Sequence, residues 1–331
     1  MPVKHMILQL HITGKCNLRC RHCYITGHNG ELSYKEISIV LRQFSGLLRS
    51  IRAASDEQVC GHVHITGGEP FMHPQIQQIL WLLLLYRRNF HYAVMSNATM
   101  LKHLHLIKRL NLKSLQVSVD GDEKTHDSIR GKGNFKAVCQ GLDILSRCGI
   151  PTRVSFTAHL DNYRLLSQVA EICLKHHAAS LWSDRYIPVA GSEIRPMDKM
   201  NMQEYVTLLR TLAHNPRYRA GGLMIQNHRA LQFLGGNEVP YTCIAGEGLI
   251  VVDENGDIYP CRRLPIICGN IRETNLKAVY YNSPVFQDLR RHEVTEKCVG
   301  CMHKEKCCGG LRCMTYAHSG EYNHPDPCCY L

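Results

Sequence analysis

The sequence predicts an α/β fold in which an incomplete barrel of parallel strands and helices is followed by a small cysteine-rich domain. Short β-like runs alternate with longer amphipathic stretches through the first part of the chain, as they do in parallel βα units. This alternation stops near residue 237, too early for eight units. From Cys243 to the end, 10 of the 17 cysteines fall within 89 residues, which indicates organisation by metal rather than by an apolar core.

Six strands and five helices are expected in the first part of the chain. Apolar and β-branched runs place the strands at residues 7–12, 62–66, 92–96, 115–120, 152–158 and 181–187. Helical periodicity places the helices at residues 34–48, 75–86, 100–110, 135–148 and 165–176. We therefore expect a partial (β/α)6 barrel over residues 1–237 and a second domain over residues 238–331.

Composition argues against several classes of protein. The chain has 331 residues and a formal net charge of +11, but no aromatic-interleaved basic stripe of the kind that binds nucleic acid. Its most apolar segment, residues 79–86, is too short to cross a membrane. No signal peptide precedes the first strand, so the many cysteines indicate a reducing cytoplasm rather than disulfide bonds.

The first candidate metal site follows the first strand, in the run HITGKCNLRCRHCY. Cys16, Cys20 and Cys23 form a C-x3-C-x2-C pattern. Three thiolates on one tight loop can hold three irons of a cubane and leave the fourth iron open to a ligand. The alternative is a zinc loop or simply buried cysteines, but neither His11 nor His22 completes a paired zinc element persuasively.

This loop resembles the signature of the radical S-adenosylmethionine superfamily, and Tyr24 matches the aromatic residue that usually follows the last cysteine. The resemblance implies a [4Fe–4S] cluster on Cys16, Cys20 and Cys23. It also implies reductive cleavage of S-adenosylmethionine to methionine and a 5′-deoxyadenosyl radical, which abstracts a hydrogen atom from the substrate. By the same resemblance the barrel is of the TIM-like kind.

Two further motifs follow the second and third strands. Gly67, Gly68 and Glu69 resemble the family's GGEP motif, which binds the amino group of the methionyl part of the cofactor. Glycines admit a close backbone approach, and a carboxylate accepts bonds from an ammonium. Ser96 and Asn97 match a position where the family often has Thr-Asn-Gly, although an alanine replaces the glycine here.

The end of the fourth strand carries Ser118 and Asp120, and Arg130 follows in the next segment. In similar enzymes the serine and the arginine help to hold polar groups of the cofactor, which a hydroxyl and a guanidinium can do. The alternative for Asp120 and Asp127 is turn formation and helix capping. All these motifs fall at the carboxyl ends of strands, where a barrel builds its active site.

The cysteines of the second domain resemble the SPASM extension, which holds two auxiliary [4Fe–4S] clusters. The resemblance implies one cluster on Cys298, Cys301, Cys307 and either Cys328 or Cys329, with Cys328 taken first. Cys243, Cys261 and Cys313 then contribute to the other, and its fourth ligand is either Cys268 or an open iron site. Counted from Cys307, the family's usual C-x3-C step falls on Leu311, which is not a cysteine. Cys313 is therefore reached either by a longer C-x5-C step from Cys307 or by a step from Cys308. The alternative is a zinc ribbon.

Cysteines outside these patterns have no thiol partner at ligand spacing, and we expect them to be buried and structural. They are Cys60, Cys139, Cys148 and Cys173. None of the 20 histidines is assigned to catalysis.

Enzymes similar to this chain over both parts mostly modify peptides or proteins, which implies a ribosomal peptide maturase forming a crosslink, a thioether or another oxidised product. Arg262 and Arg263 stand where the sulfatase-maturing branch carries an aspartate, which disfavours that branch. The alternatives are a dehydrogenase or dehydratase acting on a small molecule such as an aminosugar, and a non-catalytic zinc protein. Expected partners are a peptide or small protein and an electron donor such as flavodoxin or ferredoxin. Because the chain begins at its first strand, we also expect either a separate leader-recognition protein or recognition by the barrel itself.

Overall fold

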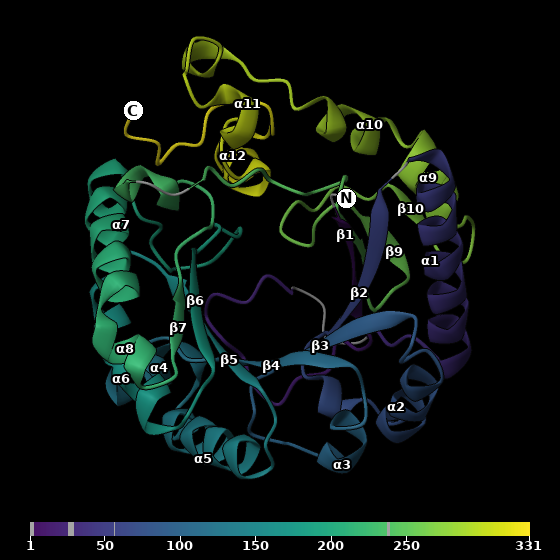
Figure 1. The fold of residues 1–331 in the computed structure, drawn as a ribbon, viewed down its shortest axis with the longest axis horizontal. Helices are drawn as coiled ribbons and strands as arrows, with labels where there is room; N and C mark the ends of the chain where they lie inside the picture. The colour runs from purple at the N-terminus through teal and green to yellow at the C-terminus, as the bar shows by residue number, and fades with distance from the viewer. Residues whose placement is uncertain (1–2, 26–29, 56, 237–238) are drawn as a thin grey trace.

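The computed structural model describes residues 3–25, 30–55, 57–236 and 239–331. Each of the six predicted strands forms. They are β1 (Val3–His11), β2 (Gln58–Thr66), β3 (Phe90–Ser96), β4 (Leu112–Ser118), β5 (Thr152–Ala158) and β6 (Ser180–Arg185). Neighbours pair in chain order and every pair is parallel, which confirms the predicted partial barrel (Figure 1).

The sheet extends beyond the six strands on both sides, and it has ten strands within the described ranges. Beyond β6 lies β7 (Met224–Gln226), in a stretch for which the sequence offered no motif. On the other side β8 (Leu249–Val252) pairs in parallel with β1, and the short strands β9 (Asp257–Tyr259) and β10 (Gly269–Asn270) follow antiparallel. The second part of the chain therefore continues the barrel sheet. The expected boundary at residues 237 and 238 lies outside the described residues.

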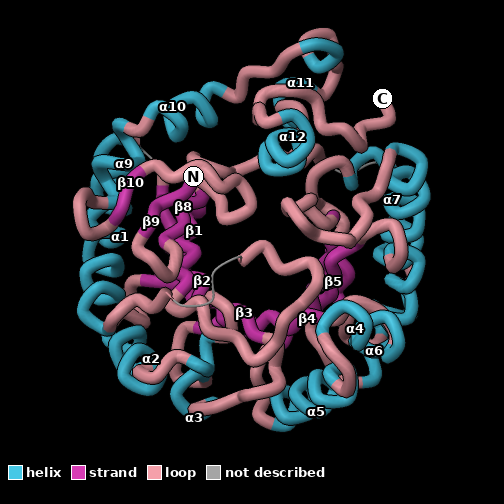
Figure 2. The backbone as a smooth tube through the Cα atoms, turned by 180° about the vertical axis from the view of Figure 1, so that it is seen from behind, coloured by secondary structure: helices cyan, strands magenta, loops and turns pink. Residues whose placement is uncertain are grey.

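Helices cover the outside of the sheet (Figures 1 and 2). The first eight are α1 (Tyr34–Ala54), α2 (Ile76–Leu85), α3 (Leu104–Ile107), α4 (Glu123–Arg130), α5 (Asn134–Arg147), α6 (Leu166–Lys175), α7 (Lys199–His214) and α8 (Pro216–Ala220). A capping box between Ser33 and Glu36 fixes the start of α1. The helix predicted at residues 100–110 is reduced to the four residues of α3, which follows His103 in the left-handed conformation.

The two faces of the strands differ in character. Met6, Leu8 and Leu10 of β1 have no exposed surface and belong to the same apolar cluster as Val40 and Phe44 of α1. The residues that alternate with them are only partly buried or are polar, and they point to the other face of the sheet. The main core therefore lies between the sheet and the helices. Loops enter the inside of the barrel (Figure 2).

The last part of the chain lies along the open side of the barrel (Figure 1). It contains α9 (Leu276–Asn282), α10 (Pro284–Arg291), α11 (Lys304–Cys307) and α12 (Arg312–Ser319). Short 3-10 helices cover Pro70–Met72, Tyr163–Leu165, Gln232–Gly235 and Glu296–Cys298. A small apolar cluster that includes Leu264, Leu289, Leu311 and Met314 supports this part, so it does not depend on metal alone.

One buried ion pair joins the last segment to the barrel. Arg185 of β6 donates from Nη1 and Nη2 to both carboxylate oxygens of Asp326, at 2.7 and 2.6 Å.

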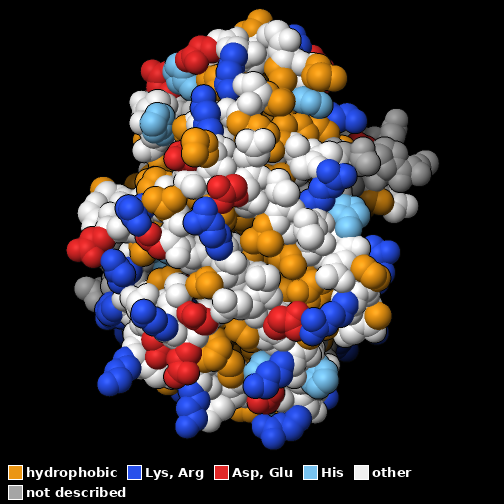
Figure 3. All heavy atoms as spheres, turned by 90° about the vertical axis from the view of Figure 1, so that its left-hand side faces the viewer, with side chains coloured by type: hydrophobic (Ala, Val, Ile, Leu, Met, Phe, Trp, Pro, Cys, Tyr) orange, Lys and Arg blue, Asp and Glu red, His pale blue; other side chains and the backbone are white. Residues whose placement is uncertain are grey.

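On the molecular face in Figure 3, Lys and Arg side chains are interspersed with Asp, Glu and apolar residues. No helix within the described residues is long and apolar enough to cross a membrane.

Candidate functional site

The loop that carries Cys16, Cys20 and Cys23 begins where β1 ends, and the glycines after β2 pack directly against its backbone. Gly68 donates its N–H to the Thr13 carbonyl at 2.7 Å. A Cβ atom added to Gly67 would lie 2.3 Å from the Thr13 carbonyl oxygen. The two glycines are therefore needed for the contact between the GGEP segment and the cysteine loop, in addition to any approach to a ligand.

The three thiols of the loop are partly exposed, and hydrogen-bond donors surround them. The Leu18 N–H donates to Cys16 Sγ at 3.4 Å, and Arg130 Nη1 lies 3.7 Å from Cys20 Sγ. Burial raises the pKa of Cys16 and Cys20, and Arg130 opposes this for Cys20. A set of three thiols with backbone and guanidinium donors suits an anionic iron–sulfur cluster with one free iron.

Glu69 is fully buried at the centre of a second group, next to the loop. Ser96 Oγ lies 3.0 Å from each of its carboxylate oxygens, and the Asn97 N–H donates to Oε2 at 2.8 Å. Burial raises the pKa of Glu69 to about 7 in spite of these bonds. Ala98, where the family often has glycine, takes the left-handed backbone conformation with φ 60°, at a cost on the order of 1 kcal/mol.

Asp120 and Arg130 form a buried pair beside Cys20. Arg130 donates from Nε to Asp120 at 2.6 Å and reaches His22 Nε2 at 3.3 Å. Burial on its own raises the pKa of Asp120, but Arg130 and then His22 lower it to about 2. Ser118, the last residue of β4, is half-buried and pairs in register with Ser155. Asp127 accepts from the N–H groups of residues 133 and 135, so its position is explained by the local turn.

Three of the C-terminal cysteines come together: Cys243, Cys261 and Cys313. A hydrogen bond from Cys313 lowers the pKa of Cys261, and Arg263 lowers it further. The same hydrogen bond raises the pKa of Cys313, and burial and the charge of Cys243 raise it further. Arg263 also donates to Asp184 at 3.2 Å. Cys268 instead donates to the Ile266 carbonyl at 3.4 Å.

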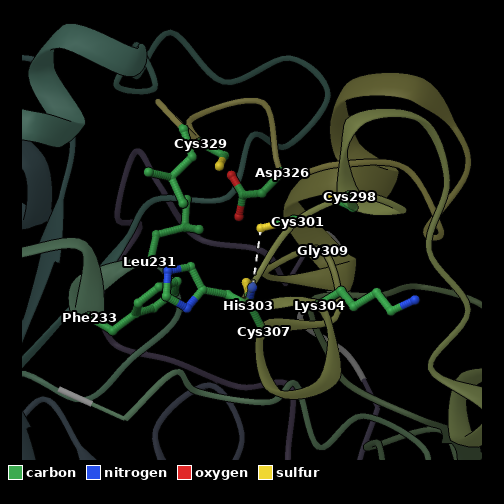
Figure 4. Close-up of a pocket in the computed structure, with 11 residues that line it drawn as sticks. Leu231, Phe233, Cys298, Cys301, His303, Lys304, Cys307, Gly309, Asp326 and Cys329 are labelled. Atoms are coloured by element: carbon green, nitrogen blue, oxygen red, sulfur yellow. Dashed lines mark hydrogen bonds between the residues drawn. The ribbon is translucent and has the colours of Figure 1, made fainter.

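A second group of cysteines lines a cavity near the C-terminus (Figure 4). Its thiols are Cys298, Cys301, Cys307 and Cys329. Cys328, the first choice from the sequence, has its Sγ 3.2 Å from the Met197 carbonyl, and Cys308 has its Sγ 3.8 Å from the Glu305 carbonyl. The geometry therefore favours Cys329 over Cys328 and Cys307 over Cys308 as cluster ligands.

Tyr24 directly follows Cys23 and is also close enough to Cys261 to be affected by its charge. Burial raises the pKa of its hydroxyl, Cys23 and Cys261 raise it further, and Arg262 and Arg263 oppose them. One side chain is thus within electrostatic range of both thiol groups. The motif predicted the aromatic residue, but no pattern in the sequence indicated that it lies near Cys261 of the second domain.

His11 is a site residue that sequence reasoning missed. Its ring packs edge-on against Tyr24, with centroids 6.1 Å apart, and it has no exposed surface. Neither ring nitrogen has a hydrogen-bond partner in the described part of the chain. Burial, followed by Arg262, lowers the pKa of His11, so the imidazole is neutral. A lone histidine at the end of a strand carries no motif, and only its place beside Tyr24 reveals it.

Two family models match the chain. The radical SAM superfamily model covers residues 10–167, and the model of the SPASM iron–sulfur cluster-binding domain covers residues 243–302. The protein is therefore a radical SAM enzyme, and the two domains imply [4Fe–4S] clusters and S-adenosylmethionine as cofactors. More particularly, it combines a radical SAM domain with a C-terminal SPASM domain.

Relatives with different activities are similar to nearly the whole chain. The AdoMet-dependent heme synthase of Methanosarcina barkeri is 25% identical, covering 96% of this chain and 94% of its own length. The mycofactocin maturase MftC of Mycolicibacterium smegmatis is 24% identical, covering 96% of this chain and 81% of its own length. The S-adenosylmethionine-bound structure of Streptococcus suis SuiB has a TM-score of 0.78 at 18% identity, covering 99% of this chain and 78% of that one. SuiB has also been solved with its precursor peptide SuiA.

Proposed function

We propose that this radical SAM enzyme oxidises a peptide or small protein, as a maturase that forms a crosslink, a thioether or another product lacking two hydrogen atoms. The observation that carries the proposal is the position of Tyr24, within range of Cys23 and of Cys261. A substrate held beside this ring would lie between the site where hydrogen is abstracted and a second thiol-bound centre. An oxidation needs both, because it removes two electrons.

When bound, S-adenosylmethionine and the iron–sulfur clusters would supply a hydrogen-abstracting 5′-deoxyadenosyl radical at the first site and a one-electron acceptor at the second. Glu69 would accept hydrogen bonds from the cofactor's ammonium group. Ser96 and Asn97 would fix the orientation of the Glu69 carboxylate. Arg130 would offset the negative charge at Cys20. Tyr24 and His11, whose rings pack together, would exclude water between the two sites.

A peptide as substrate is supported by the similarity to MftC and by the shared fold with SuiB. Residues of the site add a chemical argument. Arg229 and Arg263 both donate to the single carboxylate of Asp184, so this part of the molecule carries excess positive charge. Part of that charge would offset a thiolate-bound cluster, and the rest would favour an acidic peptide. We further propose a cytoplasmic location, flavodoxin or ferredoxin as electron donor, and a separate leader-recognition protein.

The proposed function is tested by mass spectrometry of a short peptide encoded beside the gene. The peptide is incubated anaerobically with the reconstituted enzyme, S-adenosylmethionine and a reductant. A mass loss of two hydrogens in the peptide supports the proposal. The Cys261→Ala variant should still form deoxyadenosine but leave the peptide unchanged, and Cys148→Ala, a thiol outside all three groups, should behave as the wild type. Unchanged peptide with continued deoxyadenosine formation contradicts the proposal.

A second candidate is oxidation of a small molecule. The observation in its favour is the similarity to heme synthases, which spans 96% of this chain and 94% of the Methanosarcina barkeri protein. The excess arginine charge near Asp184 would equally suit the carboxylates of a porphyrin. Deoxyadenosine formation stimulated by a carboxylated porphyrin, or by a free sugar, and not by peptide would favour this class.

A further inference from the structure

A cluster of metal-binding side chains lies at the opposite end of the sheet from the cysteine loop. In the register of β1 and β2, His5 is the direct partner of Cys60. His62 follows Cys60 by two residues, so both side chains point to the same face of β2. That face is the inner one, because the alternate residues Val59 and Val63 are buried in the apolar core. The fold therefore places two imidazoles and one thiol together inside the barrel.

The geometry of these three side chains suits a metal ion. His5 Nδ1 and His62 Nε2 lie 2.9 Å apart, and one ligand atom from each of His5, Cys60 and His62 lies within 4.8 Å of the other two. In a tetrahedral zinc site two nitrogen ligands are on the order of 3.4 Å apart. A small separation of the two rings would therefore admit an ion. His5 is exposed and the other two are half-buried, so an ion and water can reach them.

A third imidazole and a lysine border the cluster. His91 of β3 pairs in register with His62, and their ring centroids lie 5.3 Å apart. Asn111 lies 2.7 Å from His91 Nδ1 and fixes that ring. Lys113 is a nearby cation that would oppose a metal ion, and it is exposed.

We propose that His5, Cys60 and His62 bind one divalent transition-metal ion, with zinc the best match, and that water completes a tetrahedral shell. Two imidazoles and a thiolate form a borderline-soft donor set that zinc prefers, and a water-filled fourth position is common in such sites. The ion would bridge β1 and β2 at the amino end of the barrel. This site is separate from the radical chemistry, because His11 follows His5 by six positions along β1, a distance of about 20 Å.

This proposal changes the role of Cys60, which the sequence predicted to be a buried structural cysteine. Its thiol is half-buried and lies beside two histidines instead of apolar neighbours. Spacing along the chain could not reveal these neighbours. In this sheet the partner of Cys60 is 55 positions away in sequence and adjacent only through the strand register.

The test uses the anaerobically purified holoenzyme with its iron–sulfur clusters reconstituted. After incubation with zinc chloride and removal of unbound metal, zinc and iron are measured by mass spectrometry. We expect about one zinc per chain with iron unchanged, and zinc K-edge absorption should show about two nitrogen ligands at roughly 2.0–2.1 Å and one sulfur at about 2.3 Å. His5→Ala and Cys60→Ser should weaken zinc binding about 100-fold in competition with a chelator.

The control is Cys139→Ser, which removes another half-buried thiol and should bind zinc as the wild type does. His5 is exposed, so loss of zinc in His5→Ala with unchanged iron content and thermal stability cannot come from unfolding. The proposal is overturned if the wild type binds no zinc, if the variants bind it equally well, or if the absorption spectrum shows a shell of sulfur alone, which would place the zinc in a cysteine group.

Discussion

Arg130 donates its Nε–H to Asp120 at 2.6 Å, and the two side chains are only 9% and 1% exposed. The same guanidinium reaches the thiol of Cys20 at 3.7 Å. Because α4 ends at Arg130 and β4 ends two residues before Asp120, the pair ties a helix and a strand end to the cysteine loop. A structural ion pair and a cluster-supporting contact are therefore made by one residue.

Arg130→Met should destabilise the protein by about 3–5 kcal/mol, because it leaves the Asp120 carboxylate buried and unpaired. Adding Asp120→Asn to the same chain should recover part of this loss. Thermal unfolding measures the stability of the single and the double variant. The exposed pair Arg195 and Asp161 provides the control, since Arg195→Gln should change stability by no more than about 0.5 kcal/mol. Equal effects of the buried and the exposed substitutions would contradict this interpretation.

Cofactor binding should depend on pH through Glu69. Burial raises the pKa of this carboxyl to about 7, so it is ionised above pH 7 and protonated below. A protonated carboxyl loses its charge-assisted bond to the cofactor ammonium, so affinity should be full at high pH and fall as the pH drops. Equilibrium dialysis of S-adenosylmethionine should show about tenfold weaker binding at pH 6 than at pH 8.

The matched variant for this measurement is Glu69→Gln, which keeps the shape of the side chain and removes its titration. Its affinity should be weak at every pH and vary little between pH 6 and pH 8. A variant that retains the wild-type pH dependence would show that another group is responsible.

Gly68→Ala should disrupt the first cluster site. The added Cβ would lie 2.3 Å from the Lys15 carbonyl oxygen and 2.7 Å from that of Gly14, and both atoms belong to the backbone of the cysteine loop. Forcing the loop away should cost about 1–3 kcal/mol and reduce the iron content by about one cluster. Iron analysis and thermal unfolding check this prediction.

Gly46→Ala is the control for that substitution. Gly46 lies within α1, and its nearest neighbour to a new Cβ is an Arg49 side-chain nitrogen at 3.9 Å. This change should stabilise the helix by about 0.5–1 kcal/mol and leave the iron content unchanged. If both alanine variants keep a full set of iron, the packing of Gly68 does not matter for the site.

The barrel strands and the cysteine motifs could be predicted because each depends on local pattern. Strand β5 was predicted at its observed bounds, and the three thiols of the first loop lie within eight residues. The place of His11 could not be predicted, because it depends on how the second domain returns to β1 through β8. The choice between Cys328 and Cys329 likewise depends on a chain turn near Asp326, which spacing cannot reveal.

That choice gives the last prediction. Cys329→Ala should remove about four irons, because its thiol shares a cavity with Cys298, Cys301 and Cys307, and an incomplete ligand set releases a cubane. Cys328→Ala should keep its iron, since the Cys328 thiol donates a hydrogen bond to the Met197 carbonyl instead. Both variants should still cleave S-adenosylmethionine at the first site, and only Cys329→Ala should lose product formation. Iron analysis, deoxyadenosine assays and product mass spectrometry separate the two residues, and iron loss in Cys328→Ala alone would reverse the assignment.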